Sequence, residues 1–301
     1  MAVFIASSDE TEIGGHRGMF MHSGLLAPED DWSRYFAPAW EERVLLAPPA
    51  IPYLHVIDLR NREWQKANGI CLTDSEINTK LDEGVDVIMQ LGSFVAVGTR
   101  MNAGVFLDAV GKKKIVKMTL NKKPQRLLVD HVSFFGHVTV LKYVNKHYPD
   151  AAKVDFLVDR KHGVFDRLTE YYATLAASLR AIGEPDLPRL LGKLIPGGPD
   201  TRVPLQAADL VLWHIGRSFR PQHLTREDHF RLKKLEHMRE AVTELPDHAV
   251  RKMGRVFLEK LNEQRISELR RDNEETHASS AQRNKGQIGR RKSAKAKEAE
   301  A

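Results

Sequence analysis

The sequence predicts an α/β fold in which helices flank a mixed β-sheet. The chain begins with two apolar stretches, residues 3–7 and 19–26, which are separated by polar residues and by Gly14-Gly15. Such a pair is typical of a β-hairpin. From residue 153 onward, strand-like and helix-like segments alternate. Hairpin strands followed by this alternation favour a mixed sheet covered by helices.

The first half of the chain adds two helices and a further strand. Pro28 and the acids after it predict the start of a helix, and Trp32, Phe36, Trp40 and Val44 recur along it at a spacing of four. Residues 53–58 read as a strand because apolar and β-branched residues dominate there. Residues 73–90 have a helical period, and Thr73 with Glu76 forms the sequence of a capping box.

The remaining elements follow from hydrophobic periodicity. We expect strands at residues 94–99, 115–120, 153–159 and 189–195, and helices at 124–147, 165–182 and 205–219. Residues 225–273 are charged and helical in pattern, and we expect two helices divided near Pro246.

These elements suggest three regions. Residues 1–222 form the α/β domain, residues 223–274 a helical extension, and residues 275–301 a disordered basic tail. Residues 283–301 carry seven Lys/Arg and two Glu, so most of the net charge of +6 lies in the tail. A basic segment without aromatic residues buries too little surface to order itself, and it either contacts polyanions or only aids solubility.

The composition of the 301 residues indicates a globular protein of the cytoplasm. Hydrophobic residues make up 42% and charged residues 29%, as in ordinary soluble chains. Cys71 is the single cysteine and the first residues do not resemble a signal peptide, so nothing favours secretion. No apolar run approaches the ~20 residues of a membrane span, so no membrane partner is expected.

Three aspartates occupy unusual positions. Asp9 and Asp159 each end a predicted strand, and Asp209 lies on the apolar stripe of a predicted helix. An ionised carboxylate in such a place costs several kcal/mol unless a cation or hydrogen bonds compensate it. If the three converge, Mg²⁺ or Mn²⁺ would offset their repulsion, and a pair of such ions can promote phosphodiester cleavage. Neutralisation by Arg160, Lys161 or Arg202 is the structural alternative.

Several segments resemble a bacterial and phage domain-of-unknown-function family. The family opens with a strand that runs into Asp-Glu-Ser-Gly and closes with a Gln-x-Ala-Asp-Leu helix. The matching stretches here are VFIASSDET, HVIDLR, KVDFLVDRKHG and VPLQAADLVLW, within residues 3–219. The family is similar to the ribonuclease-H-like superfamily, whose acidic residues bind divalent metals, so the resemblance implies a ribonuclease-H-like mixed sheet.

The resemblance assigns roles residue by residue. It implies that Asp9, Asp159 and Asp209 are the catalytic, metal-binding aspartates and that Glu10 is a further metal ligand. Thr11-Glu12 stands where the family has Ser-Gly.

Three further polar residues accompany the aspartates as supporting or substrate-contacting candidates. Gln206 lies one helical turn before Asp209, where it could orient that carboxylate, contact substrate or cap its helix. His55 and Asp58 lie three residues apart, and they could share a site only if the chain turns between them. An ordinary structural role for this pair is the alternative.

Two functions follow as hypotheses. The first is a Mg²⁺- or Mn²⁺-dependent nuclease that hydrolyses phosphodiester bonds in RNA or DNA. The second is a non-catalytic module that binds nucleic acid or protein, for instance in a phage-defence or mobile-element system. The oligomeric state is open in both.

Overall fold

The computed structural model describes residues 2–13, 18–110, 124–160, 164–252 and 255. The chain divides into two compact units, Met1–Val250 and Arg251–Ala301. All the elements described below belong to the first unit. The predicted strand at 115–120 and the predicted tail at 275–301 lie outside the described residues.

Six strands of the described residues form one mixed sheet in the order β5-β4-β1-β2-β3-β6. Hairpin strands β1 and β2 are antiparallel, as are β2 and β3, whereas β4 is parallel to β1, β5 to β4 and β6 to β3. The strands are β1 (Val3–Ile13), β2 (Met19–Pro28), β3 (Val95–Asn102), β4 (Lys153–Asp159), β5 (Leu191–Gly197) and β6 (Arg239–Glu244).

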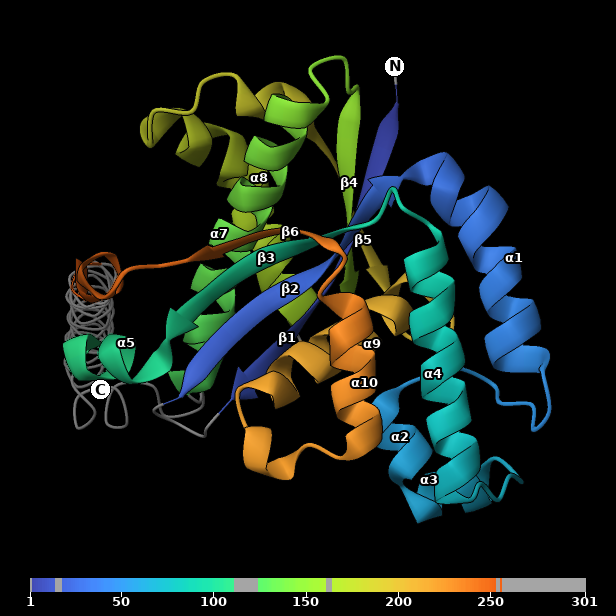
Figure 1. Cartoon of the computed structure of the whole chain (residues 1–301). Coiled ribbons are helices and arrows are strands. Elements are labelled where there is room, and N and C mark those ends of the chain that lie inside the picture. The colour runs from blue at the N-terminus through green and yellow to red at the C-terminus, as the bar shows by residue number, and fades with distance from the viewer. Residues whose placement is uncertain (1, 14–17, 111–123, 161–163, 253–254, 256–301) are drawn as a thin grey trace, which may run out of the picture. The chain divides into compact units, whose positions relative to one another are not determined.

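Helices cover both faces of the sheet (Figure 1). One face packs against α7 (Pro124–His147) and α8 (Val164–Ala181). The other carries α4 (Asp74–Gln90), α9 (Val203–Ser218) and a helical segment made of η1 (Asp31–Phe36), α1 (Ala37–Trp40) and η2 (Glu41–Leu46). Shorter elements are α2 (Val56–Arg60), α3 (Arg62–Ala67), α5 (Ala103–Val110), η4 (Leu187–Leu190), η5 (Pro221–His223) and α10 (Arg226–Leu235).

The predicted α/β class and the hairpin are therefore confirmed, and sequence patterns explain several elements. Thr73 and Glu76 form the predicted capping box at the start of α4. Trp32, Phe36 and Trp40 are all buried in one core cluster. Their spacing of four stays on one face because η1 and η2 are π-type turns, which are wider than α-helical turns.

Three predictions of local structure need correction. Residues 53–58 were expected to form a strand, but the chain turns into α2 at Val56. The strand expected at 189–195 begins later, at Leu191, after the short helix η4. Of the two helices expected within residues 225–273, α10 forms the first, and residues 247–252 after Pro246 are helical, but between them Arg239–Glu244 joins the sheet edge as β6.

Candidate functional site

Strands β1 and β4 lie side by side in the sheet. β4 ends at Asp159 as expected, but Asp9 does not end its strand, because β1 continues to Ile13 in its pairing with β2. The last residues that pair β1 with β4 are Ser8 and Val158, so the next residues along these parallel strands are Asp9 and Asp159. Helix α9, which carries Asp209, contacts both strands. Asp9 and Asp159 therefore occupy neighbouring backbone positions, and the helix that carries Asp209 packs against the same two strands.

Asp209 lies inward, as its place on the apolar stripe predicts, and its side chain is 14% exposed. One oxygen, Oδ2, accepts a hydrogen bond from the backbone N–H of Val56 at 3.0 Å. That N–H belongs to the first turn of α2, where backbone donors have no partner within the helix. The carboxylate thus stabilises the start of α2, and this contact supplies part of the compensation that a buried charge requires.

Gln206 performs a related task one turn earlier in α9. Its Oε1 accepts hydrogen bonds from Trp40 Nε1 at 2.8 Å and from the N–H of Leu54 at 3.0 Å. Its amide Nε2 donates to the carbonyl of Pro199 at 2.6 Å. Gln206 is buried, so it ties the helix around Trp40, the chain at Leu54 and the loop before α9 into one unit.

The turn into α2 places His55 and Asp58 together, which a strand would not have done. His55 Nδ1 lies 3.0 Å from Asp58 Oδ2, and His55 Nε2 lies 3.6 Å from Asp209 Oδ1. The first distance is that of an ion pair, yet its angle does not make a hydrogen bond. An imidazole ring is therefore held between two carboxylates, and it links the predicted His55/Asp58 pair to Asp209.

Sequence reasoning missed two aromatic residues that support this pair. The Tyr53 hydroxyl donates to Asp58 Oδ2 at 2.9 Å, and Trp64 Nε1 donates to the Tyr53 oxygen at 2.8 Å. Burial, followed by the bond to Asp58, raises the pKa of Tyr53, so its hydroxyl keeps its proton. The only sequence signal was the presence of Tyr53 two residues before His55.

The carboxylate oxygens available here are ligands that a hard divalent cation prefers. Asp159 and Asp209 offer carboxylate oxygens, which Mg²⁺ and Mn²⁺ prefer. Among the described side chains, no group of three or more His, Cys, Asp or Glu is arranged to hold a metal ion. The side chains of Asp9 and Glu10 lie outside the described part of the chain, so the metal hypothesis depends on where the backbone places them.

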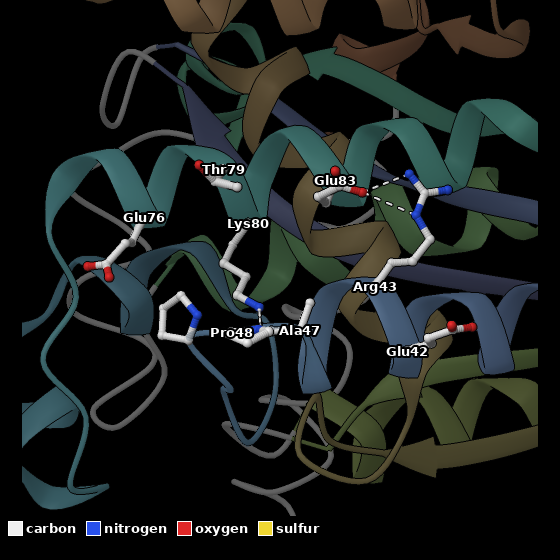
Figure 2. A pocket seen from close by; sticks show the side chains of 9 residues that line it. Glu42, Arg43, Ala47, Pro48, Glu76, Thr79, Lys80 and Glu83 are labelled. Atoms are coloured by element: carbon white, nitrogen blue, oxygen red, sulfur yellow. Dashed lines mark hydrogen bonds and ion pairs between the residues drawn. The ribbon is translucent and has the colours of Figure 1, made fainter.

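A cavity of about 760 Å³ lies elsewhere, between η2 and α4 (Figure 2). None of the predicted site residues lines it, and its charged groups already have structural tasks. Lys80 donates to the carbonyls of Val44 and Ala47 near the end of η2, and Arg43 pairs with Glu83 at 2.7 Å. We therefore locate the candidate site by its chemistry, at Asp209 and His55, and not by cavity size.

Comparisons with known proteins provide no assignment of function. No protein-family model, curated protein or solved structure matches the chain. Within the described residues, every helix is too short or too polar to span a membrane.

Proposed function

We propose that this protein is a divalent-metal-dependent nuclease with a ribonuclease-H-like fold. The observation that carries the proposal is the proximity of these segments: Asp9 and Asp159 directly follow the last paired residues of the neighbouring strands β1 and β4, and α9 packs against both strands. The sheet supports it as well, because three antiparallel strands, β3-β2-β1, continue into the parallel strands β4 and β5. That order is the one expected of a ribonuclease-H-like sheet.

In this proposal Asp9, Asp159 and Asp209 bind Mg²⁺ or Mn²⁺, and Glu10 is an additional ligand. Bound divalent ions can activate water and offset the negative charge that develops at phosphorus. The protein fixes the positions of these carboxylates. The pairing of β1 with β2 fixes the backbone of Asp9, and Asp159 lies at the end of β4. The bond from Val56 together with His55 restrains the Asp209 carboxylate.

Asp159→Asn and Asp209→Asn test the proposal. Each substitution removes the charge and replaces the carboxylate with an amide that still has one oxygen, so in Asp209→Asn the Val56 N–H still has an acceptor. We expect both variants to lose Mg²⁺-dependent cleavage of single- and double-stranded RNA and DNA while their circular dichroism is unchanged. Asp186→Asn, at an exposed aspartate, is the matched control and should cleave normally.

Calorimetry with Mn²⁺ gives a second readout. The wild-type chain should bind Mn²⁺, and Asp9→Ala should weaken binding at least tenfold. Absence of a binding heat in the wild-type chain, or cleavage that survives Asp209→Asn, contradicts the nuclease proposal.

One observation favours the alternative, a non-catalytic module that binds nucleic acid or protein. Gln206 and Asp209 hydrogen-bond the backbone of Leu54 and Val56, so their place in the helix has a structural reason that requires no chemistry. On this alternative Asp209→Asn leaves nucleic-acid or protein binding intact, and Mn²⁺ does not bind.

A further inference from the structure

A second group of buried polar side chains lies where α9, α10 and α4 meet. We call Trp213, His214, Arg217, Asp228 and Arg231 the junction cluster. His214 and Arg231 are fully buried, and Asp228 is 1% exposed. Charged residues are almost never buried to this degree unless they are paired. The cluster shares no residue with the candidate nuclease site.

Arg231 is the most extensively bonded member. Its Nε donates to Asp82 Oδ1 at 2.7 Å, and its Nη2 donates to the carbonyl and the side-chain oxygen of Asn78 at 3.1 and 3.0 Å. Both partners belong to α4, so this guanidinium fastens α10 to α4.

Asp228 is bonded through only one of its oxygens. Oδ2 accepts from Thr225 N at 3.1 Å in the capping box that begins α10, and it lies 2.9 Å from Arg217 Nη2. Oδ1 lies 3.5 Å from Arg231 Nη1 and 3.9 Å from His214 Nδ1. Both distances exceed the 2.7–3.2 Å expected of a hydrogen bond from nitrogen to oxygen.

Six buried polar atoms of the junction cluster have no hydrogen-bond partner among the described residues. They are Trp213 Nε1, His214 Nδ1, His214 Nε2, Arg217 Nε, Asp228 Oδ1 and Arg231 Nη1. Each such atom costs about 1–3 kcal/mol if it stays unpaired. So many in one place indicate a partner that lies outside the described part of the chain.

The charges in and beside the cluster decide what kind of partner fits. Arg217 and Arg231 carry two positive charges, and two negative ones belong to Asp228 and to Asp82 of α4, which pairs with Arg231 at 2.7 Å. Burial opposes ionisation of Asp228, but the hydrogen bonds from Thr225 and the nearby guanidinium of Arg217 outweigh it and lower the pKa of Asp228, so its carboxylate is ionised. A balanced cluster does not favour an ion of either sign.

His214 also remains neutral. Burial, reinforced by the charge of Arg231, lowers its pKa to about 3 against the opposing charge of Asp228. A neutral imidazole has one donor and one acceptor nitrogen. The unpartnered atoms therefore include both donors and acceptors, and the partner must be able to donate and accept at once.

We propose that the junction cluster is a binding site for ordered internal water. One water oxygen can lie about 2.8 Å from two atoms that are themselves 3.5 or 3.9 Å apart. It would donate to Asp228 Oδ1, accept from Arg231 Nη1 and complete its bonding with His214. A buried water with about three such partners is a normal part of a folded protein.

A high-resolution crystal structure of the unaltered chain tests the site directly. We expect a density peak within about 2.7–3.2 Å of both Asp228 Oδ1 and Arg231 Nη1. A direct bond between these two atoms with no peak beside them overturns the proposal. Crystals grown with bromide supply a further check, since an anomalous signal at the peak would identify an anion site and overturn it as well.

Magnetic relaxation dispersion of water tests the same site in solution. His214→Phe fills the space with an apolar ring and should remove at least one long-lived internal water per chain. His237→Phe, at an exposed histidine, is the matched control and should remove none. An equal count in the wild type and in a folded His214→Phe variant contradicts the proposal. If His214→Phe does not fold, the crystal structure decides.

Discussion

The two halves of α9 bury polar side chains in different ways. In the first half, Gln206 makes three hydrogen bonds, two of them to groups that are distant in sequence, and its polar atoms are satisfied by protein. In the second half, His214 has no hydrogen-bond partner among the described residues at either ring nitrogen. Buried polar groups can thus fix neighbouring backbone or form a site for something else, and the bonds they lack distinguish the two cases.

The largest expected effect is a loss of stability in Arg231→Met, a substitution in α10 within the junction cluster that includes His214 of the second half of α9. The substitution removes the buried guanidinium that pairs with Asp82 and bonds Asn78, while Asp228 keeps Arg217, and breaking such a buried pair costs about 3–5 kcal/mol. Urea denaturation should show this drop, whereas Lys233→Met on the exposed side of α10 should change stability by less than about 0.5 kcal/mol. Equal midpoints for the two variants would mean that the junction cluster contributes little to folding.

The matching test in the first half is Gln206→Leu. It leaves Trp40 Nε1 and Leu54 N–H buried without an acceptor, at about 1–3 kcal/mol each, so we expect a loss of about 2–4 kcal/mol. Trp40→Phe removes one of these donors and should weaken the effect of Gln206→Leu when the two are combined. Additive losses in the double variant would argue against a shared bond.

The smallest expected effect is a pH dependence of stability that arises from His214 in the second half of α9. The folded pKa of His214 is about 3, below its ordinary value of 6.5, so the unfolded chain binds more protons between these values. Stability due to the neutral ring is therefore present above pH 6.5 and is lost as pH falls towards 3. From pH 7 to pH 5 this loss is roughly 2 kcal/mol.

Comparison with His214→Phe isolates this contribution. His22, whose pKa burial lowers to about 4, is present in both proteins and cancels in the difference. Denaturation at pH 7 and pH 5 should give a smaller loss for the variant, and identical losses would count against a neutral His214.

Local signals in the sequence were sufficient for the hairpin, for β4 and for the start of α4. Each depends on neighbours in sequence: alternating apolar residues in the strands, and the reciprocal Thr73–Glu76 capping bonds in α4. The same signals failed at residues 53–58, which were read as a strand. There the deciding bonds come from Gln206 and Asp209, about 150 residues away.

Neither β6 nor the junction cluster was predicted from the sequence, and the two reasons are related. β6 is an edge strand with mostly exposed, charged residues, so its composition matches a solvent-facing helix. In α10, Asp228, Arg231 and Leu235 share one face, but their spacing alone does not reveal that this face is buried. The scattered histidines gave no comparable signal, because the bond pattern around His214 appears only when three helices come together.

The contacts that Gln206 and Asp209 make with residues 54 and 56 have a consequence for sequence variation. They bind main-chain amides, which every residue except proline possesses. Leu54 and Val56 can therefore drift among other apolar residues without loss of these two anchors, while Leu54→Pro or Val56→Pro would release the loop from α9.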